Sequence, residues 1–179
     1  MKSLESICNI DLELLKKCVK GSYTINDDGS IDVNGDVNLN NKKLAKIPFK
    51  FRNVSGGFYC HRNRLTSLEG SPNTVGGGFY CYYNQLTTLE YAPNTVGGNF
   101  LCYDNQLTTL DGAPNNVGGG FYCYNNPNLP YSELFKIVDN VKGNILHSSF
   151  NTPEDKDKIR RDRDVKETLK DDELGSLDV

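Results

Sequence analysis

The chain has 179 residues, a formal net charge of −3 and 37% hydrophobic residues, with 17 glycines and no tryptophan. This length allows one domain with a buried core or a short solenoid. No apolar run approaches the length needed to cross a bilayer, so no membrane partner is expected. Between residues 58 and 126 only Arg62 and Arg64 are basic, which argues against a surface that neutralises the phosphates of duplex nucleic acid.

Residues 1–30 are expected to form an N-terminal helical cap. Acidic residues among the apolar ones, and the lack of a small-residue cleavage site, are typical of a helix and not of a signal peptide. This interpretation predicts a cytoplasmic location with reduced cysteines. Gly21 is the expected end of the helix. The broken apolar stripe of this helix consists of Leu4, Ile7, Leu14, Leu15, Cys18 and Val19.

A repeated motif with a constant period of 21 residues follows. Its pattern is F-x-C-x-x-N-x-L-T-x-L-x-x-x-P-N-x-V-G-G-x. A degenerate repeat unit starts at Val37, and Val33 before it matches the end of a still more divergent unit. The pattern stops at Pro127. Because one unit is too small to bury its own apolar face, such units must stack, and the period predicts a solenoid over residues 31–129. The aligned cysteines are Cys60, Cys81, Cys102 and Cys123.

Each repeat unit contains one short apolar alternation. Phe and Cys alternate with other residues, which is strand periodicity, so both are expected to point inward. The two leucines would fill the next corner, and the Pro-Asn segment and Val would cover the far side before Gly-Gly leads to the next strand. The expected core is Phe58, Phe79, Phe100 and Phe121 with the four cysteines, Leu65, Leu68, Leu86, Leu89, Leu107 and Leu110, and Val75, Val96 and Val117.

The stretch "FLCYDNQLTTL", residues 100–110, resembles the leucine-rich-repeat signature L-x-x-L-x-L-x-x-N-x-L, with Phe and Cys where Leu is usual. The resemblance covers about residues 33–129. The short period is similar to that of bacterial effector repeats, and the F-x-C and V-G-G details are similar to small leucine-rich-repeat proteins encoded by tailed phages. The resemblance implies an α/β solenoid, a short leucine-rich-repeat stack with a parallel sheet on one face and helical caps at both ends.

After the repeats, residues 130–150 are expected to form a C-terminal cap. "YSELFKIVDNV" reads as a short helix and "GNIL" as a last strand. Residues 151–179 form a charged tail with seven basic and ten acidic residues. Ile159, Val165 and Leu169 do not share one helical face, so this tail is interpreted as a solvated helix or as disorder.

The cysteines and glycines of the repeat are interpreted as structural. Cysteines on successive turns form a line, which cannot provide the tetrahedral ligands of a zinc site, and the only bases for a catalytic thiol are His61 and His147. A buried thiol ladder is expected instead. The Gly-Gly pairs lack the Lys-Ser/Thr of a phosphate loop. No catalytic residue, metal or cofactor is therefore expected. The Asn column, Asn63, Asn84, Asn105 and Asn126, is expected to satisfy backbone groups between units.

The tyrosines lie in columns that the inward Phe and Cys force onto an exposed concave face. Tyr suits exposed strands and stacks on its neighbours, which is one interpretation. The other is a recognition surface, because Tyr combines a large apolar area with a hydroxyl and loses little entropy on binding. Three columns supply the candidate partner-binding residues. These are Tyr59, Tyr80, Leu101 and Tyr122 in the first, His61, Tyr82, Tyr103 and Tyr124 in the second, and Arg62, Tyr83 and Asp104 in the third, where Asn125 follows.

Two functions remain open. The first is a non-enzymatic protein-binding module that uses the Tyr-rich face. For this module, the phage resemblance implies a host defence or regulatory protein as the partner and the host cytoplasm as the location. The second is a binder of a small molecule, nucleotide or glycan stacked on the tyrosines. The sequence indicates neither the partner's identity nor the oligomeric state.

Overall fold

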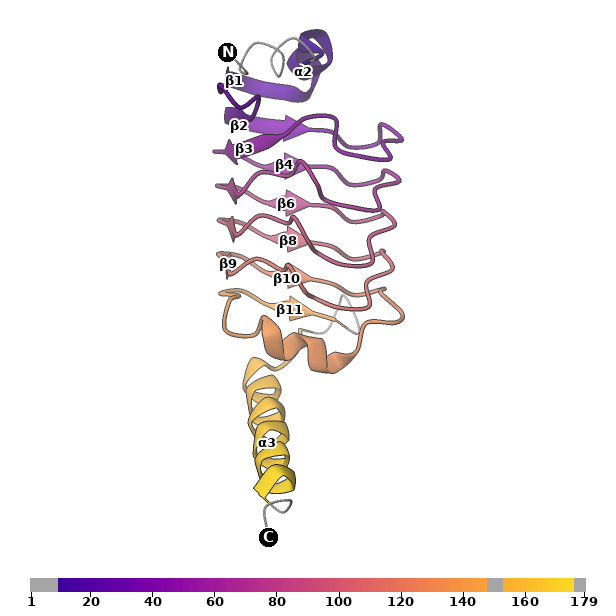
Figure 1. Cartoon of the computed structure of the whole chain (residues 1–179), viewed down its shortest axis with the longest axis vertical. Coiled ribbons are helices and arrows are strands. Elements are labelled where there is room, and N and C mark those ends of the chain that lie inside the picture. Colours follow the sequence, from indigo (N-terminus) through magenta and orange to yellow (C-terminus); the bar gives the residue numbers. More distant parts are fainter. Residues whose placement is uncertain (1–9, 148–152, 176–179) are drawn as a thin grey trace.

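The computed structural model describes residues 10–147 and 153–175. The chain forms a straight parallel β-solenoid of about six turns with a 21-residue repeat, shown in Figure 1. Residues 31–129 contain no helix, so the helices of the expected α/β class are restricted to the two ends. The predicted repeat solenoid is confirmed, but it is straight and its tyrosine face is not concave.

Two ladders of short parallel strands run along the solenoid, and both start at β2 (Ile31–Asn38). The first ladder was expected from the Phe-x-Cys alternation, whereas the second was not expected as a strand. The first continues through β4 (Phe58–Tyr59), β6 (Phe79–Tyr80), β8 (Phe100–Leu101), β10 (Phe121–Tyr122) and β11 (Ile145–Leu146). The second continues through β3 (Phe51–Val54), β5 (Thr74–Val75), β7 (Thr95–Val96) and β9 (Asn116–Val117), and a bridge joins Val117 to Val141.

The core fills the space between the ladders with the predicted Phe, Cys, Leu and Val residues, all of which are buried. Equivalent residues pair in register, as in Phe58 with Phe79 and Val54 with Val75. The phenylalanine rings therefore form a continuous stack, with centroids 5.4, 5.3 and 5.0 Å apart from Phe58 to Phe121. The degenerate first units also fit, because Val37 pairs with Phe58 and Val33 with Val54.

An asparagine closes the corner after β4, β6, β8 and β10, and it is buried at Asn84, Asn105 and Asn126. The Asn84 amide donates to the carbonyl oxygens of Cys60 and Cys81 at 3.1 and 2.9 Å, and its Oδ1 accepts from the Leu65 N–H at 3.0 Å. One side chain thus satisfies backbone groups of two successive turns, as buried polar groups require. Asn63, Asn105 and Asn126 make equivalent bonds, so the predicted role of this column is confirmed.

The expected helical cap over residues 1–30 is wrong for residues 19–30, where a strand and a turn cover the N-terminal end of the solenoid. Helix α2 (Leu12–Cys18) has only seven residues and begins where the Asp11 carboxylate accepts from the Leu14 N–H. Strand β1 (Val19–Ile25) then pairs antiparallel with β2. Gly21 does not end a helix but faces Gly35 across this pair, where a Cβ would collide with the Asn34 carbonyl. The expected stripe residues Leu4 and Ile7 lie outside the described residues.

The C-terminal end is closed by hydrogen bonds from the start of the charged tail. A 3₁₀ helix, η1 (Tyr131–Lys136), stands where the short cap helix was expected, and β11 confirms the predicted last strand. The Glu154 N–H donates to the Ile145 carbonyl at 2.7 Å, and the Lys156 ammonium donates to the carbonyl of Val141 at 2.6 Å. The same ammonium also donates to the carbonyls of Lys142 and Gly143. Open strand edges at this end thereby acquire partners.

The tail itself forms helix α3 (Lys156–Gly175), which extends away from the solenoid end in Figure 1. Ile159 is buried, and Arg160 and Arg163 both pair with Asp139. Val165 and Leu169 are 60% and 58% exposed. The first turns of α3 thus hold the helix on the solenoid, and the later turns are solvated.

The buried thiols predict how stability depends on pH. Burial raises the pKa of the Cys81 and Cys102 thiols well above the ordinary value, so these thiols ionise only after unfolding. Their contribution to the free energy of unfolding is therefore complete below about pH 8.5 and is lost as pH rises, by about 1.4 kcal/mol per pH unit for each fully ionised thiol. Urea denaturation of the reduced protein between about pH 8 and 9.5 should show this fall. It should be shallower in Cys81→Val/Cys102→Val, and an identical slope in that variant would contradict the assignment.

Candidate functional site

The first tyrosine column lies against a column of glycines. The rings of Tyr59, Tyr80 and Tyr122 fold back over the residue two positions earlier, and a Cβ on Gly78 would lie 2.6 Å from Cε1 of Tyr80. Wherever this earlier residue is Gly, the column holds Tyr. Where it is Asp or Asn, the column holds a smaller residue. The pairs are Asp36 with Asn38, Gly57 with Tyr59, Gly78 with Tyr80, Asn99 with Leu101, Gly120 with Tyr122 and Asn144 with Leu146.

Where this column holds Asp36 or Asn99 in place of glycine, the polar side chain bonds the backbone of the next turn. The Asn99 Oδ1 accepts from the Gly120 N–H at 2.8 Å, and the Asp36 Oδ1 accepts from the Gly57 N–H at 2.7 Å. From Asp36 to Gly120, each position therefore holds either a side chain that bonds the next turn or a glycine covered by a tyrosine ring. The first column is therefore half-buried packing over this glycine column.

The second column forms a parallel stack of aromatic rings, which we name the aromatic row. Ring centroids lie 4.4 Å apart from His61 to Tyr82, 4.5 Å from Tyr82 to Tyr103 and 4.5 Å from Tyr103 to Tyr124, with planes within 14° of one another. At this separation the ring faces cover each other. The row is half-buried, and its ring spacing leaves no room for a flat ligand between neighbouring rings.

The aromatic row carries no charge at neutral pH. Burial raises the pKa of Tyr103, and the neighbouring hydroxyls of Tyr82 and Tyr124 raise it further. At the N-terminal end of the row, burial and the nearby Arg62 lower the pKa of His61, so its imidazole is neutral. Its Nε2 lies 3.2 Å from the Asn40 amide, and its buried Nδ1 has no hydrogen-bond partner within the described parts of the chain.

The third column lies in a bend and not on the strand surface where it was expected. Strands β4, β6 and β8 have two residues each, and Arg62, Tyr83 and Asp104, which follow them, adopt left-handed φ values of 55°, 52° and 52°. Left-handed backbone is unfavourable for a bulky side chain. Tyr83 is nevertheless 49% exposed, with its ring edge-on to Tyr82 and Tyr103 at 5.8 and 6.0 Å. The Arg62 guanidinium lies 5.6 Å from the Tyr83 ring centroid.

The structure therefore brings all eleven candidate residues onto one rim, where the first ladder bends into the asparagine corner. Tyr83 is the most exposed aromatic residue among them. Tyr91, which sequence reasoning did not select, is 63% exposed at φ 67°. It stands where Gly70 and Gly112 stand in the flanking turns, so the break in a glycine column was the signal that could have identified it.

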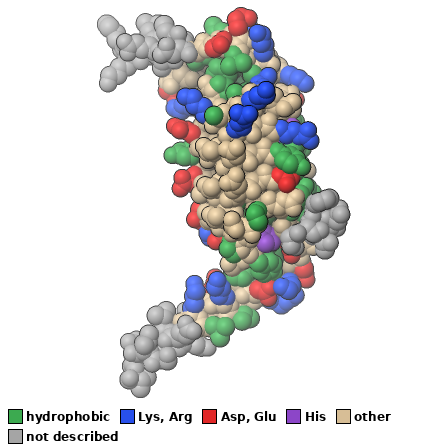
Figure 2. All heavy atoms as spheres, turned by 90° about the vertical axis from the view of Figure 1, so that its right-hand side faces the viewer, with side chains coloured by type: hydrophobic (Ala, Val, Ile, Leu, Met, Phe, Trp, Pro, Cys, Tyr) green, Lys and Arg blue, Asp and Glu red, His purple; other side chains and the backbone are tan. Residues whose placement is uncertain are grey.

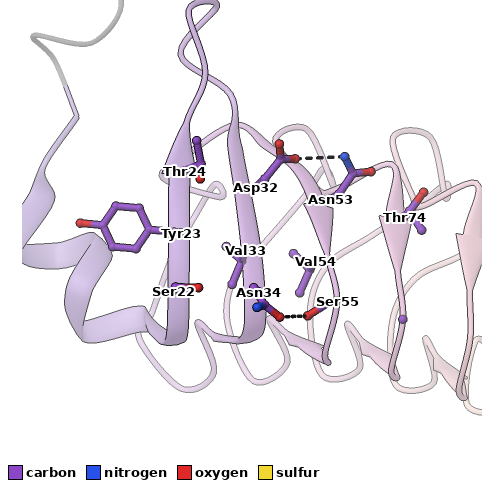
Figure 3. A pocket seen from close by; sticks show the side chains of 11 residues that line it. Ser22, Tyr23, Thr24, Asp32, Val33, Asn34, Asn53, Val54, Ser55 and Thr74 are labelled. Atoms are coloured by element: carbon purple, nitrogen blue, oxygen red, sulfur yellow. Dashed lines mark hydrogen bonds between the residues drawn. The ribbon is translucent and has the colours of Figure 1, made fainter.

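A hollow of about 440 Å³ lies on the second ladder, between β1 and β5, as Figure 3 shows. Its only carboxylate, Asp32, bonds the Arg52 guanidinium and the Asn53 amide, and Arg52 lowers the Asp32 pKa to about 2. Neither histidine nor cysteine is among the residues that line this hollow. Across residues 10–147 and 153–175, no cluster of His, Cys, Asp and Glu could hold a metal ion, and no helix is long and apolar enough to span a membrane.

No protein-family model, curated protein or solved structure matches the chain.

The Gly–Tyr pairing predicts a non-additive stability effect. Gly78→Asn alone places a side chain where the Tyr80 ring lies, and Tyr80→Leu alone removes ring packing. The double variant copies Asn99 and Leu101 of the next turn and avoids the collision. In urea denaturation, the double variant should be more stable than the sum of the single effects by about 1 kcal/mol. Additivity within about 0.3 kcal/mol would show that the two positions are independent.

Proposed function

We propose that the protein is a non-enzymatic interaction module that binds a protein partner along the aromatic row and Tyr83. The observation that carries the proposal is the row itself, an uncharged stack of rings, with the exposed Tyr83 on left-handed backbone packed edge-on beside its middle members, Tyr82 and Tyr103. Backbone strain in a bulky exposed residue is typical of functional sites. Rings held by mutual stacking lose little freedom on binding, which favours affinity for a complementary surface.

The alternative, a nucleotide, sugar or other small ligand stacked on the tyrosines, is less favoured by the same geometry. Stacking on an aromatic platform needs a free ring face. In the aromatic row the faces are 4.4 to 4.5 Å from the next ring and are already covered. Tyr83, which packs edge-on, is partly covered by Arg62. A protein surface, in contrast, can use ring edges and hydroxyls together.

The proposal includes a relation to leucine-rich-repeat proteins and a partner of the kind that phage-encoded members imply, a host defence or regulatory enzyme blocked by occlusion. Its support is the 21-residue unit and the Asn–Leu spacing of the repeat. A cytoplasmic location belongs to the same proposal. The five described cysteines are free thiols, which is consistent with a reducing compartment.

The substitution Tyr83→Asn should weaken partner binding without destabilising the fold. Asn stands at the equivalent position as Asn125 and tolerates left-handed backbone better than Tyr, so the melting temperature should stay the same or rise. Loss of a hot-spot tyrosine should weaken partner binding by about 2 kcal/mol. The partner would be captured from the host cytosol, identified, and titrated by calorimetry against the wild type and Tyr83→Asn.

Tyr82→Ala/Tyr103→Ala should weaken binding further and also lower the melting temperature, because the rings support each other. Glu90→Ala, outside the rim, is the control and should change neither. Full-strength binding by both tyrosine variants would place the recognition surface elsewhere. A melting-temperature increase with nucleotides or sugars that Tyr83→Asn abolishes would favour the small-ligand function.

A further inference from the structure

Four cations gather at the N-terminal end of the proposed surface. Lys42 and Lys43 follow the first strand turn, and Arg62 and Arg64 occupy the next turn. Lys43 and Arg64 are equivalent residues on adjacent turns, which lie roughly 5 Å apart. Figure 2 shows Lys and Arg side chains concentrated toward the upper, N-terminal end of the view, whereas the middle of the molecule below them carries mainly uncharged side chains at its centre and a few acidic ones at its sides. We name Lys42, Lys43, Arg62 and Arg64 the basic cluster.

The backbone holds the two halves of the basic cluster against each other. The Asn63 Oδ1 accepts from the N–H groups of Lys42 and Leu44, both at 3.0 Å, and the Arg64 N–H donates to the Leu44 carbonyl at 2.8 Å. The Lys43 backbone is left-handed at φ 57°. The like charges are thus fixed on neighbouring turns, where they repel each other.

No ion pair within the described residues compensates this repulsion. All four side chains are exposed, and none pairs with a carboxylate. The fold does not require cations here either, because the next two turns hold Gln85 and Gln106 at the position of Arg64. The repulsion among the four cations destabilises the fold, and no contact of the fold depends on their charge, which indicates a role in binding.

We infer that the partner in the proposed function presents an acidic segment, which docks on the basic cluster while its neighbouring residues lie along Tyr83 and the aromatic row. Arg62 connects the two parts, since its guanidinium belongs to the basic cluster and lies over the Tyr83 ring. This inference rests on the proposed function, and it adds the charge of the partner and its direction along the solenoid. Exposed complementary charges increase association rates and select partners.

An acidic protein segment fits the charge layout better than a nucleic acid does. The basic cluster covers two turns, and two turns beyond Arg62 the same position holds Asp104. A phosphate backbone that continued along the rim would meet this carboxylate and the neutral Gln85 and Gln106. The covered ring faces also offer no platform for unstacked bases. A short acidic segment needs only the first two turns.

To test this inference, displayed random peptides would be selected for binding to the full chain. The selected peptides (the winners) would then be synthesised, and their affinities measured by fluorescence anisotropy. Selected peptides should be enriched in Asp and Glu. Lys43→Gln/Arg64→Gln, which copies Gln85 and Gln106, should weaken their binding about tenfold at physiological ionic strength. Rising salt should weaken wild-type binding more than that of the variant. Lys20→Gln/Lys142→Gln removes the same charge from exposed sites elsewhere and should leave binding unchanged.

Several results would overturn the inference. These are winners without acidic enrichment, no winners, or equal binding by Lys43→Gln/Arg64→Gln. Tighter binding of single-stranded oligothymidine, lost in the same variant, would also overturn it, by making the cluster a phosphate site. If the winners depend on Tyr83 but not on the cluster, this inference fails and the proposed function stands. Dependence on neither overturns both.

Discussion

Every feature of the molecule depends on hydrogen bonding between equivalent positions of successive turns. The N–H groups of Cys60, Cys81 and Cys102 each donate to the next turn at 2.9 Å, and strands of only two residues would not maintain this register alone. The buried asparagines maintain it at the corner, where each amide satisfies carbonyls of two turns. Because unpaired buried amides and carbonyls are costly, one register is strongly favoured. The solenoid is therefore built on a polar ladder as much as on an apolar core.

Exact register places every side chain beside its own counterpart, roughly 5 Å away. Aromatic rings placed in this way stack and stabilise the fold, whereas like charges repel each other and destabilise it. The Phe stack inside the solenoid and the aromatic row outside it both result from this register. Within each of the two stacks, neighbouring rings are nearly parallel. Repulsion between equivalent positions also explains why repeated cations are rare along the middle turns. The cations at the equivalent positions Lys43 and Arg64 are the exception, and this exception supports a role in binding.

The strict period made much of the fold predictable, because it specifies which residues are neighbours across turns. The core residues of the repeats and the asparagine ladder follow from it, and the last strand at Ile145–Leu146 was predicted from its own short apolar segment. The second ladder was missed because Thr74–Val75 and its equivalents are too short to show an alternation. Strand β1 was missed because Gly21 resembles a helix end until its non-local partner Gly35 is known. The candidate residues were identified, but the left-handed bend at Tyr83 and the mutual covering of the ring faces depend on backbone geometry that no local pattern encodes.

The binding proposals require that the asparagine ladder holds the rim in place, and one measurement tests this directly. Asn105 is buried and bonds the carbonyls of Cys81 and Cys102 and the Leu86 N–H, while the adjacent Gln106 is exposed. The free energy of unfolding of Asn105→Ala, compared with that of Gln106→Ala, should be lower by about 2 kcal/mol or more, because buried backbone groups of two turns lose their partner. A difference within about 0.5 kcal/mol would contradict the central role of the ladder.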